Sequence, residues 1–149
     1  QHQRLLECGD WLKEKVIVDC GIPQAGAQPT RPSRSEEIAH AFPGAHVVKA
    51  LNAIPLSALA FIARQRHPQL GSIYPAGLFC SDDAGSKIVI AGLLEELNLE
   101  PVDCGPLSNA MLLDGIALLN SYISEHSTTP YIMTSITPKK DGSPADAFF

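Results

Sequence analysis

Polar or small residues follow each short apolar run of this chain, and their types define the chemistry that the sequence can offer. The positions concerned are Asp19-Cys20-Gly21, Asn52, Asp82-Asp83 and Asp103-Cys104-Gly105. Carboxylates there can orient loops or act in acid–base catalysis, an amide can bind a ligand, and thiols can be redox-active.

The residue types favour positioning over catalysis. Asp19 and Asp103 have no paired carboxylate at a useful spacing, and no base or cation near Cys20 or Cys104 in sequence would lower a thiol pKa. We therefore expect buried, inert thiols and nominate no catalytic residue. Asn52 has two interpretations: it hydrogen-bonds a carboxamide of a ligand, or it satisfies its own turn.

Metal and disulfide chemistry have little support in the sequence. The 4 cysteines are far apart without a C-x-x-C pair, and the 5 histidines show no i, i+4 pairing. The pattern predicts reduced thiols in a cytoplasmic protein without a metal site.

Composition bounds the class of protein. The 149 residues are 45% hydrophobic and 18% charged with a net charge of -5, which indicates a soluble globular protein that binds neither nucleic acid nor membrane. We expect one domain over residues 1–126 and an irregular tail over 127–149.

The small basic cluster of Arg31 and Arg34 either attracts a phosphate at a helix start or forms a solvated loop.

Apolar runs alternate with helical patterns along the chain. Residues 3–13 are expected to be the end of a helix. Further helices are expected over 34–42, 55–66, 83–98 and 107–123, and strands over 16–20, 46–51, 77–81 and 100–104. Ser33 and Glu36 fit a capping box, and Asp82 or Asp83 caps the fourth of these helices. This alternation predicts an α/β fold: a partial Rossmann-like, mainly parallel sheet of about four strands with flanking helices.

Ligands of such sheets bind beyond the carboxyl ends of the strands. The expected site is built by four segments: Cys20-Gly21-Ile22-Pro23, Asn52-Ala53-Ile54, Cys80-Ser81-Asp82 and Gly105-Pro106-Leu107.

Several of these segments resemble one family. Residues 43–52, PGAHVVKALN, resemble the PGA-x-VVKAFNT segment of NADP oxidoreductases that use a deazaflavin coenzyme, and the N-terminal domain of six-transmembrane ferric reductases has the same fold. Residues 16–19 resemble the family's VVIDATNP, 101–108 its EPVDAGPLS, and 82–87 its GDDAEAK.

The resemblance implies a cofactor and a reaction. NADP(H) would lie across the strand ends beside a deazaflavin or flavin, and hydride would pass between the two rings without a protein acid or base. The implied cofactor-binding residues are Cys20, Gly21, Ile22, Pro23, Asn52, Ala53, Ile54 and Leu107.

The chain also departs from the family. Ile22 replaces an Asn, Ala53 a Thr, Leu51 a Phe and Ser81 a Gly, and the family's G-x-G-x-x-G turn does not occur in this sequence. The start at Gln1 instead of Met suggests a trimmed or incomplete chain.

Two functions remain open. One is an NADP-dependent oxidoreductase domain of which this chain is the C-terminal part. The other is a catalytically silent domain that forms a homo-oligomer, pairing two copies through the unpaired edge of residues 16–20 and the apolar helix 107–123. That helix is either core or a contact surface between copies.

Overall fold

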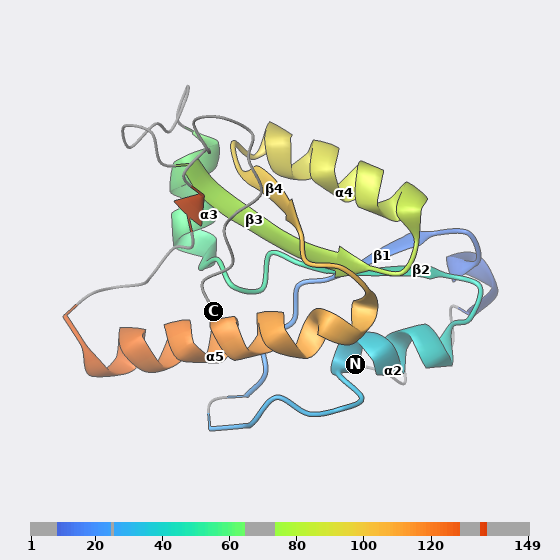
Figure 1. Ribbon diagram of the computed structural model, residues 1–149, viewed down its shortest axis with the longest axis horizontal. Coiled ribbons are helices and arrows are strands. Elements are labelled where there is room, and N and C mark those ends of the chain that lie inside the picture. Colours follow the sequence, from blue (N-terminus) through green and yellow to red (C-terminus); the bar gives the residue numbers. More distant parts are fainter. Residues whose placement is uncertain (1–8, 25, 65–73, 129–134, 137–149) are drawn as a thin grey trace, which may run out of the picture.

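The computed structural model describes residues 9–24, 26–64, 74–128 and 135–136, which form a sheet covered by helices (Figure 1). The elements in chain order are η1 (Gly9–Leu12), β1 (Val16–Asp19), α2 (Arg34–Ala41), β2 (His46–Ala50), α3 (Leu56–Ala63), β3 (Tyr74–Ser81), α4 (Ala84–Glu96), β4 (Glu100–Asp103), η2 (Leu107–Asn109), α5 (Ala110–His126) and β5 (Ser135–Ile136).

The sheet has the strand order β1-β2-β3-β4. β1 pairs with β2 and β3 pairs with β4 in parallel, whereas β2 and β3 are antiparallel. The short β5 adds an antiparallel pair at the start of β3. The result is a mostly parallel, open α/β sheet consistent with a partial Rossmann-like fold.

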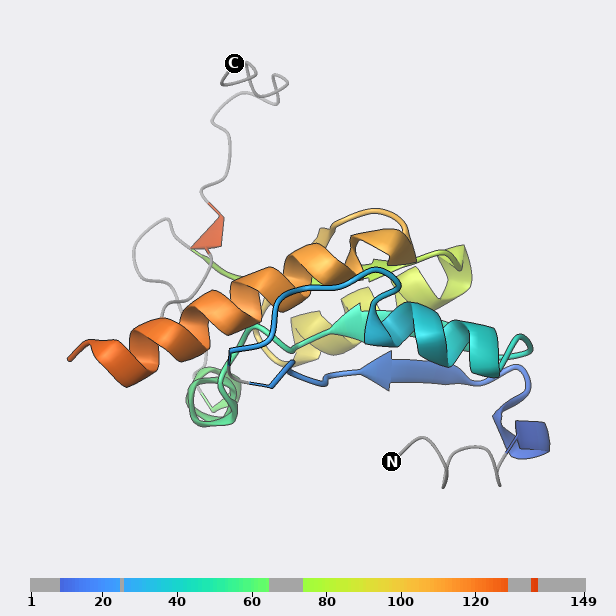
Figure 2. The same cartoon turned by 90° about the horizontal axis from the view of Figure 1, so that it is seen from below.

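Successive residues of a strand face opposite sides of the sheet, so β2 contributes to two cores. Val48 and Ala50 pack with Ile62 of α3 and with Ile90 and Leu94 of α4. On the other face, Val47 packs with Ile38 and Phe42 of α2 and with Leu107, while Cys80 packs with Ala110 and Leu113 of α5. Figure 2 shows α2 and α5 following one another across this second face.

Most predicted elements are confirmed, with shifted ends. The capping box at Ser33 is present: its hydroxyl accepts from the Glu36 amide, and the Glu36 carboxylate accepts from the Ser33 amide. Asp83, not Asp82, caps α4 by accepting from the Ser86 amide. The last helix begins as the 3-10 turn η2 and continues as α5 to His126, three residues beyond its predicted end.

Two expectations about elements need correction. α3 begins after Pro55 and ends at Ala63 before its predicted limit of 66, and β3 begins at Tyr74 and not at Gly77. Of the predicted tail the structure describes only residues 127–128 and the short strand β5. Of the predicted N-terminal helix the structure describes only the short η1, and residues 1–8 lie outside the described residues.

The expectation that all strand carboxyl ends meet at one edge is wrong. β2 and β3 are antiparallel: Ala50 at the end of β2 pairs with Phe79, and Ser81 at the end of β3 pairs with Val48. The carboxyl ends of these two strands therefore point in opposite directions. Periodicity identifies a strand but not its direction, so the sequence did not reveal this reversal. None of the described helices is long and apolar enough to cross a membrane.

Two glycines test the packing of α4 against the sheet. A Cβ at Gly77 in β3 would lie 2.8 Å from Leu94 Cδ2, whereas a Cβ at Gly92 in α4 would meet nothing within 4 Å. We expect Gly77→Ala to lower the free energy of unfolding by about 1–3 kcal/mol through overpacking. Gly92→Ala should raise it by about 0.5–1 kcal/mol, because alanine favours the helix. Urea unfolding measures both, and equal effects would contradict the described contact of α4 with β3.

Candidate functional site

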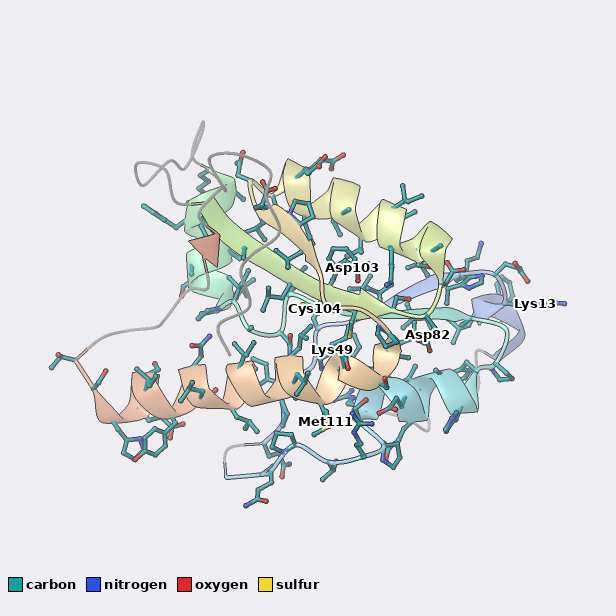
Figure 3. The ribbon with its side chains drawn as sticks, in the orientation of Figure 1. Lys13, Lys49, Asp82, Asp103, Cys104 and Met111 are labelled. Carbon is teal, nitrogen blue, oxygen red and sulfur yellow. The ribbon has the colours of Figure 1, made fainter. Side chains whose placement is uncertain are left out.

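A buried lysine occupies the space between the sheet and α5. Asp19 of β1 and Lys49 of β2 are direct partners in a parallel register, so their side chains share one face of the sheet. That face is covered by α2 and α5, and Lys49 is 1% exposed. Figure 3 shows its side chain between the strands and α5.

The Lys49 ammonium has three oxygen partners. Nζ lies 3.2 Å from Asp19 Oδ2 and 2.8 Å from Asp114 Oδ1, and it donates to the carbonyl of Gly21 at 2.7 Å. An ammonium has three protons to donate, so these contacts can satisfy it fully. Burial of the charge is therefore compensated within the protein.

Further hydrogen bonds fix both carboxylates. Asp19 Oδ2 accepts from the Ser35 hydroxyl at 2.8 Å, and Asp19 Oδ1 accepts from the Gly21 amide at 2.9 Å. Asp114 Oδ1 accepts from Asn52 Nδ2 at 3.1 Å. We call Asp19, Ser35, Lys49, Asn52 and Asp114 the lysine network.

The helical repeat of α5 explains why Asp114 points inward. Its buried residues recur every three or four positions and include Leu113, Asp114, Ala117 and Asn120. Two polar side chains thus lie on the apolar face of the helix, above the ends of β1 and β2.

The Asp19 carboxyl remains ionised at neutral pH. Burial by itself would raise its pKa, but the charge of Lys49 and the hydrogen bonds from Ser35, Gly21 and Lys49 outweigh burial and hold the pKa below its ordinary value. Asp19 accordingly presents a negative charge to the Lys49 ammonium at neutral pH.

Two cavities border the lysine network. The first, of about 270 Å³, is lined by the segment after β1, by Arg34, and by Lys49 and Asp114 of the network. The second, of about 200 Å³, lies between the turn after β2 and α5 and is lined by Ile22, Asn52, Ala53, Pro55, Ala117, Asn120, Ser121 and Ser124. Because Ile22 lines both, the cavities adjoin. We call them the loop cavity and the amide cavity.

The structure gathers most of the predicted site residues at these cavities. Gly21, Ile22 and Pro23 line the loop cavity, and Asn52 and Ala53 line the amide cavity. Their role in cofactor binding stays a prediction.

Three other predicted site residues lie elsewhere. Ile54 packs against the core on the α4 side, Cys20 is exposed and borders neither cavity, and Leu107 is buried against α2. Leu107 is separated from the others because β3 and β4 run opposite to β1 and β2.

The cysteines differ from expectation in one case. Cys80 is buried as predicted and Cys104 is half-buried, but Cys20 is exposed. The pKa of all three thiols is raised: that of Cys80 by burial, to about 12, that of Cys104 by partial burial, and that of Cys20 by partial desolvation of its sulfur and by the neighbouring charge of Asp19. None is poised as a thiolate.

Sequence reasoning missed Lys49, Asp114 and Asn120. A signal was present: each is a polar residue at a core position of an otherwise apolar strand or helix. Buried charges require partners, so a lone lysine in the run VVKAL predicts a nearby carboxylate.

Comparison with known proteins supports the fold. The sequence matches no model of a known protein family. Among solved structures, the chain is similar to a candidate F420-dependent NADP reductase from Arthrobacter sp. FB24, with a TM-score of 0.64 and 25% identity over 78% of this chain and 55% of that one.

A hypothetical protein from Sinorhizobium meliloti is also similar, with a TM-score of 0.53 and 23% identity over 72% of this chain and 54% of that one. This second similarity shows the fold alone. The chain therefore spans about half the length of both solved structures, and the expected family is supported at the level of the fold.

Removal of the central ammonium tests the network. Lys49→Met leaves two carboxylates buried without their cation, so we expect the free energy of unfolding to fall by about 3–5 kcal/mol. Lys87 pairs with Asp103 in a partly exposed bridge, and Lys87→Met should cost less than about 1 kcal/mol. Similar losses for both variants in urea unfolding would contradict the account.

The lowered pKa of Asp19 predicts a pH dependence. Between its folded-state pKa and the ordinary value of 3.8, the folded protein binds fewer protons than the unfolded chain. The stabilisation that ionised Asp19 gives to the folded protein is thus present above pH 3.8, and it is lost as the pH falls through the folded-state pKa of Asp19. We expect the stability difference between wild type and Asp19→Asn to shrink over that range. A difference independent of pH would show that ionisation of Asp19 does not stabilise the fold.

Proposed function

We propose that this chain forms the nicotinamide-binding part of an NADP-dependent oxidoreductase that transfers hydride between nicotinamide and a deazaflavin or flavin. The observation that carries the proposal is the pair of adjoining cavities beyond the carboxyl ends of β1 and β2. Segments that resemble the deazaflavin-dependent family line both cavities. The fold similarity to a candidate F420-dependent NADP reductase supports the same reading, since F420 is a deazaflavin.

The residues present fit one end of the dinucleotide. Cavities of about 270 and 200 Å³ can each take a ring-sized group, and their walls combine apolar side chains with a few fixed polar groups. The sequence contains no G-x-G-x-x-G turn for the pyrophosphate. The described cavities are therefore assigned to the ring end of the dinucleotide.

The chain's own residues would position the rings and exclude water. NADPH supplies the hydride when it is bound, and no protein proton has to move with it. The Gly21 carbonyl is held by Lys49, and the Asn52 side chain is held by Asp114, so one lining residue of each cavity is fixed before a ligand enters. Lining residues that are fixed in advance can hold the two rings close together and aligned for hydride transfer.

A second candidate function is a catalytically silent assembly domain. Among the described strands β1 pairs only with β2, and α5 exposes Leu112, Leu119 and Tyr122. An open edge and an apolar helix face can both bind a second copy. This alternative requires a homo-oligomer and no cofactor.

Titration of the protein with NADPH, alone and with a deazaflavin analogue, tests the proposed oxidoreductase. Ile22→Trp should weaken binding about tenfold or more, because Ile22 is 52% exposed and borders both cavities, so an indole can fill them without disturbing the core. Val89→Trp is the matched control, since Val89 lies on α4 and is 60% exposed.

Calorimetry should detect binding to wild type and to Val89→Trp, and mixing with oxidised deazaflavin should consume NADPH. Absence of binding to wild type, or equal binding by both tryptophan variants, would contradict the proposal. A stable dimer that binds no nucleotide would support the assembly domain.

A further inference from the structure

The amide cavity contains two buried asparagines from separate elements. Asn52 follows β2 and is 3% exposed, and Asn120 lies on the inner face of α5 and is 8% exposed. Both line the same cavity of about 200 Å³. Polar side chains this deeply buried require hydrogen-bond partners.

The partners of the two side-chain nitrogens fix the orientation of each amide. Asn120 Nδ2 donates to the carbonyl of Ala53 at 2.7 Å, and Asn52 Nδ2 donates to Asp114 Oδ1 at 3.1 Å. Either amide turned over would place an oxygen against another oxygen, which is repulsive. The orientations therefore follow from chemistry.

The two side-chain oxygens remain available. No hydrogen bond within the described residues reaches Oδ1 of Asn52 or of Asn120, and no fully buried side-chain oxygen among those residues is without a partner. Both oxygens are thus accessible, and both residues line the amide cavity.

A pair of acceptor oxygens selects for a donor. We propose that the amide cavity binds an N–H donor of a planar ring, a primary carboxamide or a cyclic imide, with Asn120 as an acceptor that Ala53 holds in place. Asn120 is therefore a binding residue beyond the turn segments from which the site was inferred.

This inference rests on the proposed function. The nicotinamide carboxamide presents an NH₂ group, and the deazaflavin ring presents an imide N–H between two carbonyls. Both are donors of the required kind, and the apolar walls given by Ile22, Ala53 and Ala117 suit a ring face.

The experiment compares ligands with and without the donor. Affinities for NADP⁺ and for its 3-acetylpyridine analogue, which keeps the carbonyl but lacks the NH₂, are measured by ligand-observed NMR. We expect Asn120→Ala to weaken NADP⁺ binding about three- to tenfold, the effect of one lost hydrogen bond, and to leave the analogue's affinity unchanged.

Asn109→Ala is the matched control. Asn109 Nδ2 also donates to a backbone carbonyl, that of Cys104, at 2.7 Å, but the residue borders neither cavity. Thermal unfolding should show comparable stability losses for the two variants, and only Asn120→Ala should alter the ligand preference.

The outcomes separate the inference from the proposed function. If wild type binds NADP⁺ and Asn120→Ala leaves that affinity unchanged, the inference is overturned and the proposed function stands. The same holds if Asn120→Ala lowers the affinities for NADP⁺ and for the analogue equally. Wild type can instead bind a deazaflavin and prefer it to the N3-methyl form, which lacks the imide N–H. Loss of this preference in Asn120→Ala then supports the imide as the donor, and retention of the preference overturns the inference. Binding of neither ligand by wild type overturns both.

Discussion

The ammonium of Lys49, enclosed between two carboxylates, is the interaction on which the described site depends. A charge that is 1% exposed is stable there only if its partners are in place. Those partners come from β1 and from α5, which are about 95 residues apart in sequence, as Asp19 and Asp114. The ion pairs thus fix how the strand ends and the last helix meet.

The same contacts explain why the cavities lie where they do. Asp19 and Lys49 hold the backbone of Gly21, which lines the loop cavity, and Asp114 holds the side chain of Asn52, which lines the amide cavity. A Cβ at Gly21 would lie 2.8 Å from Asp19 Oδ1, so the network also requires a glycine at this position. The charges thus stabilise residues that line both cavities.

Much of the architecture could be predicted because local signals determine it. The apolar runs gave β1, β2 and β4, and the Ser33–Glu36 pair located the start of α2. The direction of β3 could not be predicted, because alternation of side chains is the same for parallel and antiparallel strands. That reversal moved Leu107 away from the turn at Asn52.

The site was predictable only in part. Residues adjoining the strand ends were found by position, whereas Lys49, Asp114 and Asn120 act through contacts between elements that no local pattern contains. Polar residues at core positions were the available signal, and only the fold shows which of them meet.

Binding of the nicotinamide ring in the paired cavities at the ends of β1 and β2 should change the surroundings of the residues that line them. Backbone amide shifts of the isotope-labelled protein, recorded while NADPH is added, test it most directly. We expect changes concentrated at Gly21, Ile22, Ala53 and Asn120. Changes confined to α4 or to β4, or no changes at millimolar NADPH, would contradict it.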